Sequence, residues 1–192
     1  MTTFHFLSFS QAASRPNSKA ERLYTALRKN HFPEAGDTTE RNLAVGRTQG
    51  FANLDERTKM SLMISGLYCL MDGTTIVSVA VMKDANIMRL VTMPNFRHKG
   101  YASLLVQHIA EKLRESGCPC IWSPVAPEVR PLFAKLGWVQ VGQHSPDGCL
   151  DWCPPWSVDL YGQRREWNPR PWLLHLLARM VEPTPSGGSG VV

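Results

Sequence analysis

The alternation of apolar and polar residues predicts a mixed α/β chain that opens with strands. Residues 3–9 alternate and are rich in aromatic side chains, which predicts a first strand. Three more strands are expected at 66–70, 74–82 and 87–92, and β-branched residues dominate the second of them. Asp72-Gly73 marks a tight turn, because glycine adopts the positive φ that a type I′ turn needs. The last three strands therefore form an antiparallel meander.

A helical pattern follows the meander. Apolar residues between 101 and 113 fall at i, i+3, i+4 and i+7, which is the spacing of a buried stripe, and Gly117 is placed to end this helix with a left-handed cap. The remaining elements are expected as a strand at 118–123, a helix at 128–136 ended by Gly137, and a strand at 138–141. This order predicts a crossover between two parallel strands in an α/β fold.

Other segments carry weaker patterns. A helix is expected at 17–30, a loop at 31–52, a second helix from Asn53 and a last helix at 168–181. Four of the six tryptophans lie between Asp151 and Leu173, beside several prolines. The predicted plan is a main domain at 1–144, an extension at 145–182 packed on the same domain, and a disordered Pro, Ser and Gly-rich tail at 183–192.

Composition narrows the class of protein. The chain has 192 residues, of which 43% are hydrophobic and 19% charged, and this suits one folded domain with a modest extension. Its formal net charge of +5 is spread along the chain, so an anionic ligand is permitted while nucleic acid is not indicated. No apolar run reaches the roughly 18 residues of a membrane span, and no secretory signal is expected. Five cysteines, an odd number, predict free thiols and a cytoplasmic location.

The segment from Leu90 to Ser103 carries the clearest candidate chemistry. A predicted strand enters a short loop with two fixed cations, Arg97 and Lys99, and the loop opens directly into a helix. Unpaired amides and the helix dipole favour an anion there, and Gly100 allows close approach of a phosphate or pyrophosphate. The alternative is a basic turn that caps the helix and binds nothing.

Two segments resemble motifs of the GNAT superfamily, the acetyl-CoA-dependent N-acyltransferases. Arg97, Gly100 and Ala102 match the pattern Arg/Gln-x-x-Gly-x-Gly/Ala of its pyrophosphate loop, and residues 131–138 are similar to its Leu-Tyr-x-Lys-x-Gly-Phe segment. The resemblance covers roughly residues 66–142. It implies a mixed, mostly antiparallel sheet with splayed central strands flanked by helices, to which the Trp-rich C-terminal extension is added.

The resemblance also implies a co-substrate, acetyl-CoA, and its binding residues. Loop amides would hold the pyrophosphate, the end of the preceding strand would pair with the pantetheine arm, and 121–123 would diverge from 87–92 to admit the thioester. An amide near Val91 or Thr92 would stabilise the oxyanion. The expected cofactor-binding residues are Val91, Thr92, Met93, Arg97, His98, Lys99, Gly100, Tyr101, Ala102 and Ser103.

Catalytic residues are less clearly marked. The family's tyrosine acid corresponds to Phe133, which cannot donate a proton, so Ser123 or water would serve, the thiolate would leave unprotonated, or acyl transfer has been lost. Thr92 and Ser123 are the expected catalytic residues. The strand at 87–92 holds no carboxylate, and the base is sought among His31, Glu34, Asp37, Glu40, Asp151 and Asp159.

The resemblance predicts transfer of an acetyl group to the amine of a small molecule, by direct attack in a ternary complex. The alternatives are a protein or peptide N-acetyltransferase, a CoA-binding module without turnover, and a different reaction on an apolar metabolite. No metal is expected, because Cys149, Cys153 and His144 fit no standard zinc spacing. Cys118 and Cys120 are expected as buried thiols. The apolar run at 172–177 is expected to be buried or to form a homodimer contact.

Overall fold

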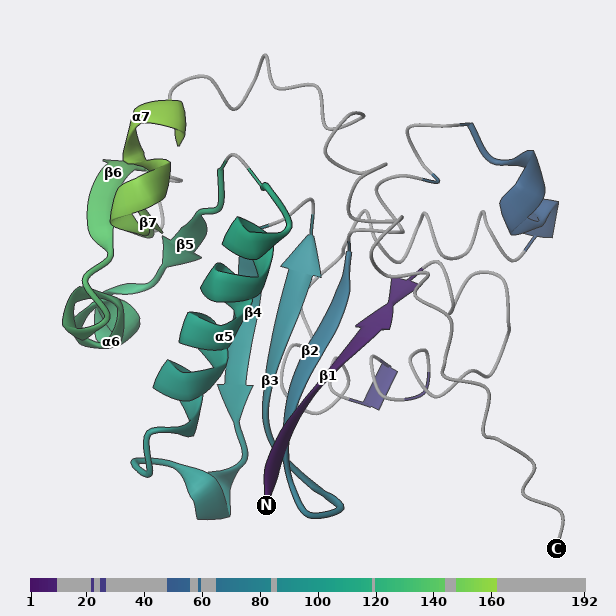
Figure 1. The fold of residues 1–192 in the computed structure, drawn as a ribbon, viewed down its shortest axis with the longest axis horizontal. Coiled ribbons are helices and arrows are strands. Elements are labelled where there is room, and N and C mark those ends of the chain that lie inside the picture. Colours follow the sequence, from purple (N-terminus) through teal and green to yellow (C-terminus); the bar gives the residue numbers. More distant parts are fainter. Residues whose placement is uncertain are drawn as a thin grey trace, which may run out of the picture.

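The computed structural model describes residues 1–9, 22, 25–26, 48–55, 59, 65–83, 86–118, 120–143 and 148–161. Its strands form two separate sheets (Figure 1). The first is antiparallel, in the order β1 (Thr2–Ser8), β2 (Gly66–Asp72), β3 (Thr75–Lys83) and β4 (Asn86–Thr92). The second has the order β5-β7-β6, with β5 at Ser123–Val125, β6 at Val139–Gln143 and β7 at Leu150–Cys153. The mixed, mostly antiparallel α/β fold is thus confirmed.

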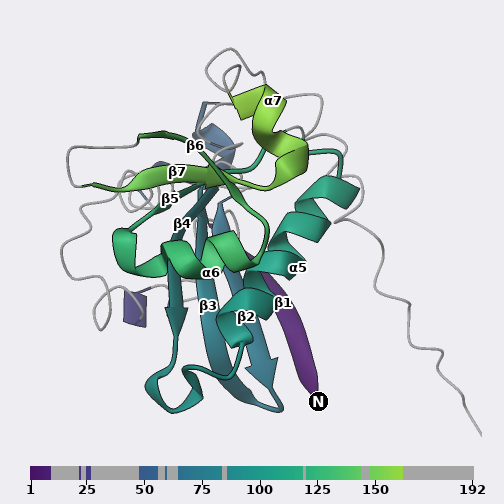
Figure 2. The same ribbon diagram turned by 90° about the vertical axis from the view of Figure 1, so that its left-hand side faces the viewer.

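In the part of the chain that the structure describes, the helices that flank these sheets are α5 (Tyr101–Glu115), α6 (Arg130–Lys135) and α7 (Val158–Tyr161). Helix α5 packs against β2, β3 and β4, and Figure 2 shows the second sheet running across the direction of these strands. The predicted apolar stripe is confirmed, because α5 buries Leu105, Val106, Ile109, Ala110 and Leu113. Short 3₁₀ turns lie at Phe51–Asn53 (η1), Pro94–Phe96 (η2), Pro127–Val129 (η3) and Pro155–Ser157 (η4). None of the described helices is long and apolar enough to cross a bilayer.

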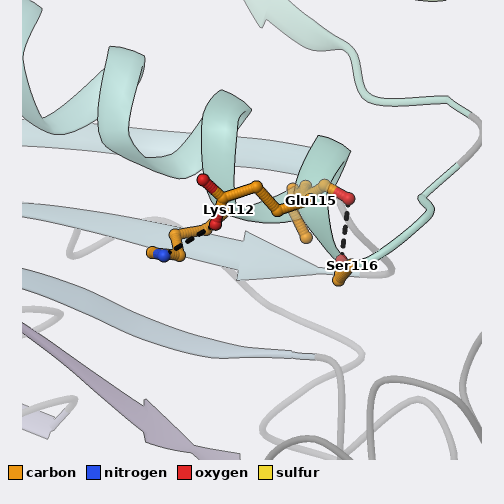
Figure 3. Close-up of polar contacts among 4 residues, drawn as sticks. Lys112, Glu115 and Ser116 are labelled. Carbon is orange, nitrogen blue, oxygen red and sulfur yellow. Dashed lines mark hydrogen bonds and ion pairs between the residues drawn. The ribbon is translucent and has the colours of Figure 1, made fainter.

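Polar contacts close the C-terminal end of α5 (Figure 3). Lys112 Nζ lies 2.7 Å from Glu115 Oε2, and the Ser116 hydroxyl donates to the Leu113 carbonyl at 2.7 Å. Gly117 then adopts φ 77°, so that its amide reaches Arg114 and the Cys118 amide reaches Leu113. These bonds form a Schellman motif, and the cap expected at Gly117 is confirmed.

The same motif ends α6. Gly137 has φ 75°, its amide bonds to the Ala134 carbonyl, and the Trp138 amide bonds to the Phe133 carbonyl. The two aromatic side chains meet edge to face, with ring centres 5.0 Å apart. An apolar contact between these two positions commonly accompanies a Schellman motif, so the local structure gives Phe133 a packing role.

Several expectations need correction. Only Gly73 has positive φ in the β2–β3 turn and Thr74 does not, which fits a type II′ turn and not type I′. The strand expected at 118–123 occupies only Ser123–Val125. Strand β7 was not predicted, and it separates β5 from β6; both pair antiparallel with β7, so they run parallel to each other without being neighbours.

Other predicted segments fall wholly or mostly outside the described residues. These are the helices at 17–30, from Asn53 and at 168–181, much of the loop at 31–52, the run at 172–177 and the tail at 183–192. The proposed domain boundaries stay a prediction.

Candidate active site at the edge of β4

Strand β4 is the edge strand of the first sheet, and it meets the second sheet at its own beginning. The Ile87 amide donates to the Trp122 carbonyl at 3.2 Å, and the Ser123 hydroxyl donates to the Ile87 carbonyl at 2.9 Å. From there toward Thr92, β3 is the one described strand that forms a ladder with β4, because β5 belongs to the other sheet. This arrangement agrees with the divergence expected between residues 121–123 and 87–92.

The alternation of an antiparallel ladder shows which β4 amides face the open edge. The Met93 amide donates to the Val77 carbonyl at 2.9 Å, so residues 93 and 91 direct their amides and carbonyls toward β3. Residues 90 and 92 then direct theirs away from β3. Of the two amides expected near the thioester, that of Val91 belongs to the ladder, whereas that of Thr92 points outward.

A buried hydroxyl pair fixes the Thr92 side chain. Ser78 on β3 is fully buried, and its hydroxyl donates to the Val91 carbonyl at 3.0 Å. Because Ser78 has one proton, the 3.1 Å contact between the two hydroxyls places the Thr92 proton on the bond to Ser78. The Thr92 hydroxyl therefore donates its proton to a buried group of the sheet, the Ser78 hydroxyl. Ser123, 3% exposed, likewise directs its proton at a protein carbonyl, that of Ile87.

After β4 the chain turns through η2 into the loop that precedes α5. The Phe96 and Arg97 amides bond back to Met93 and Pro94, at 2.9 and 3.3 Å. His98 then takes φ 61°, unusual for a residue with a side chain, and Gly100 takes φ 83°. Residues 97–100 are all exposed, and the loop lies at the same end of the molecule as the N-terminus (Figure 1).

The amides that follow form the most distinctive feature of the site. In the described part of the chain, the amides of residues 98–103 donate to no backbone carbonyl, and the first bond of the helix runs from Leu104 to Gly100 at 3.0 Å. None of the described side chains caps this end of α5, and the first turn of the helix holds no acidic residue. Unpaired amides and the positive end of a 15-residue helix dipole therefore lie at the same place.

The loop side chains lie beside these amides. Arg97 Nε donates to the outward carbonyl of Thr92 at 3.3 Å, which links the loop to the open edge of β4. Lys99 Nζ lies 5.4 Å from the centre of the Phe96 ring, and that ring meets Tyr101 edge to face at 6.0 Å. The structure therefore brings the predicted residues 91–93 and 97–103 together around one strand edge and one helix start. This arrangement can hold a chain of phosphates followed by an extended amide-bearing arm.

Phe133 lies in the main hydrophobic core with 2% of its surface exposed. It packs against Trp138 and offers no proton.

Among the base candidates, Asp151 is the one whose side chain the structure describes. It lies on β7, is 1% exposed, and accepts a hydrogen bond from the Tyr161 hydroxyl. Trp122 packs edge to face against Tyr161 at 6.3 Å, and Gly142 leaves room for the phenol, because a Cβ there would stand 2.8 Å from the oxygen. Asp159 lies on α7, and residues 31, 34, 37 and 40 fall outside the described residues. No pattern in the sequence pointed to Tyr161 as the partner of Asp151.

The five cysteines are all free, and Cys118 and Cys120 are buried as expected. Burial raises the pKa of the Cys118 thiol to about 12 and that of Cys153 to about 11, so both are protonated at neutral pH. Among the described residues, no three His, Cys, Asp or Glu side chains gather around a point that could hold a metal ion. His144 lies outside them.

Comparison with known proteins identifies the family of this chain. The model of the Acetyltransferase (GNAT) family matches residues 40–138, which are 99 of the 192 residues. A curated relative, the uncharacterized N-acetyltransferase YitI of Bacillus subtilis, is 31% identical over 83 residues, covering 38% of this chain and 55% of that protein. The chain thus spans about half the length of this curated relative.

Solved structures share the fold at low sequence identity. Naa50 of Arabidopsis thaliana, in complex with the bisubstrate analogue CoA-Ac-MVNAL, has a TM-score of 0.52 and 13% identity over 79% of this chain and 97% of that chain. A GNAT-family protein from Desulfovibrio desulfuricans has a TM-score of 0.50 and 11% identity, over 80% of this chain and 96% of that chain. Because the family model covers just over half of the sequence, the chain belongs to the Acetyltransferase (GNAT) family.

Proposed function

We propose that the chain transfers an acetyl group from acetyl-CoA to an amine of a small molecule. The observation that carries the proposal is the row of unpaired amides at residues 98–103 beside the outward amide and carbonyl of Thr92. Diphosphate oxygens accept hydrogen bonds from the first group, and the pantetheine amides pair with the second as an added strand. Membership of the GNAT family and the CoA-derived ligand in the Naa50 structure support acetyl-CoA as the acetyl donor.

In the proposed mechanism the neutral amine attacks the thioester carbonyl directly while both substrates are bound. The Thr92 amide donates to the oxygen on which negative charge develops, and this stabilises the tetrahedral intermediate. The hydroxyls of Thr92 and Ser123 hold the backbone around this amide, since their protons bond to Ser78 and Ile87. The amine proton leaves to a base or a water chain, for which Asp151 and Asp159 are the candidates in the described chain.

Phe133 favours a second candidate, a CoA-binding module without turnover. A buried phenylalanine provides no acid for the leaving thiolate, and loss of a general acid costs on the order of 10²- to 10⁴-fold in rate. A CoA thiolate is nonetheless a tolerable leaving group, so slow transfer is expected.

One assay separates these candidates. Acetyl-CoA is incubated with the protein and with panels of small amines and peptides, and free thiol is measured together with acetylated product. Thiol release that depends on a small amine supports the proposal, and release that depends on peptides alone assigns a peptide acetyltransferase. Binding of CoA without amine-dependent release assigns the module.

We further propose a reducing, cytoplasmic setting, which the five free cysteines support. A homodimer through residues 172–177 stays a prediction.

A further inference from the structure

The helix α5 connects β4 to β5, which is the crossover that parallel strands require, and where the two strands meet a parallel ladder begins with one backbone bond. In such a ladder, a residue donates to the carbonyl before its partner and accepts from the amide after its partner. Ile87 donates to the Trp122 carbonyl, so the next donor to the Ile87 carbonyl is the nitrogen at position 124. That residue is Pro124, which has no N–H.

A side chain, and not a backbone amide, supplies the hydrogen bond to the Ile87 carbonyl. Ser123, one residue earlier, donates to it through its hydroxyl at 2.9 Å, in a site where the serine is 3% exposed. The buried carbonyl is therefore satisfied without a further rung of the ladder. On its other edge β5 pairs normally with β7, through Ser123 with Trp152 and Val125 with Leu150, so the interruption is confined to the side that faces β4.

We propose that Pro124 is a positioning residue that stops β5 from pairing further along β4, and so leaves the outward groups of Leu90 and the outward amide of Thr92 to a ligand. The role of this edge in binding the pantetheine arm rests on the proposed function. The separation of the two strands rests on the hydrogen-bond geometry alone. Proline is excluded from central strands for the same reason, and here β5 would otherwise be central, between β4 and β7.

The test restores the missing donor with Pro124→Ala. Pro127→Ala is the matched control, because Pro127 starts η3, where no amide donor is needed. The new amide at position 124 is expected to exchange slowly with deuterium, as a ladder amide does. Calorimetry is expected to show that acetyl-CoA binds to the Pro124→Ala variant about two- to tenfold more weakly than to the parent, because the ligand must break one or two ladder bonds. The control variant is expected to bind as the parent does.

A second pair of variants tests the strand junction without ligand. Ser123→Ala is expected to lower the melting temperature of the parent by about 2–10 °C, because the buried Ile87 carbonyl loses its donor. In the Pro124→Ala background the loss is expected to be smaller, since the new amide at position 124 takes over. Equal losses in the two backgrounds would contradict this donor exchange.

The outcomes separate the two claims. In the Pro124→Ala variant, an amide at position 124 that exchanges as fast as an exposed one overturns the proposal, and so does a protected amide with unchanged acetyl-CoA affinity. A parent protein that does not bind acetyl-CoA refutes the proposed function instead, while exchange at position 124 and the Ser123 variants still decide whether Pro124 separates the strands.

Discussion

Two glycines allow the conformational cost of adding a side chain to be separated from the effect of that side chain on ligand binding. Gly100 and Gly137 have similar φ angles, 83° and 75°, and a Cβ added at either meets no atom within 4 Å. Replacing either glycine by alanine therefore carries the cost of a left-handed residue and no clash in the free protein. That cost is about 1–2 kcal/mol. Gly100 lies among the unpaired amides, whereas Gly137 ends α6.

Both variants are expected to lose similar stability. For a chain of this size, about 1–2 kcal/mol corresponds to a fall in Tm of about 2–8 °C. Acetyl-CoA at about a hundred times its Kd is expected to raise the parent Tm by about 5–10 °C, since it contributes ~2.7 kcal/mol. Gly137→Ala keeps this ligand-induced rise, and Gly100→Ala loses most of it, because the new methyl group occupies the surface that the diphosphate approaches.

Scanning fluorimetry with and without acetyl-CoA measures both quantities on each variant. A Gly100→Ala protein with the full ligand-induced rise would refute the placement of the diphosphate at this loop. Equal loss of the rise in both variants would mean that destabilisation, and not local contact, weakens binding.

Other parts of the chain support three more predictions. Arg97→Glu is expected to abolish the acetyl-CoA-induced rise in Tm, because a carboxylate replaces a cation beside the diphosphate, while Arg97→Lys keeps part of it; an unchanged rise for the glutamate variant would show that residue 97 lies away from the anion. Phe133→Tyr is expected to destabilise the fold by about 1–3 kcal/mol in urea denaturation without raising turnover, because the hydroxyl enters a core in which Phe133 is 2% exposed; faster turnover would instead make position 133 the acid site. His108 stacks on Phe4 at 3.7 Å, and desolvation lowers its pKa from the usual 6.5, so the folded chain binds this proton less readily than the unfolded chain; the stability is full above pH 6.5 and falls as the pH drops below it. His108→Phe is expected to flatten the fall in unfolding free energy between about pH 7 and pH 5, and an unchanged slope would assign that fall to other groups.

Local patterns in the sequence were enough to predict the elements around the candidate site. The meander, α5 and the glycine caps at 117 and 137 were predicted because period-2 and period-3.6 patterns and a left-handed glycine act within a few residues. Arg97, Gly100 and Ala102 marked the loop for the same reason, since strand, loop and helix start are contiguous in the sequence.

What the sequence did not reveal depends on pairing between distant segments. Strand β7 has four residues, and its buried Asp151 disguises the apolar alternation; its place between β5 and β6 follows from pairing with residues far from it in the chain. Ser78 resembles a solvent-facing residue of a strand until its pairing with Thr92 is known. Likewise, the missing amide of Pro124 can be recognised as important only when Ile87 is found opposite Ser123.

Titration of ¹⁵N-labelled protein with coenzyme A, followed by amide NMR spectra, shows directly which amides bind the diphosphate and the pantetheine arm. The largest shifts are expected on the amides of residues 98–103 and on the outward amide of Thr92, with the ladder amide of Val91 little changed. Shifts confined to other parts of the chain, or none at saturating coenzyme A, would contradict this expectation.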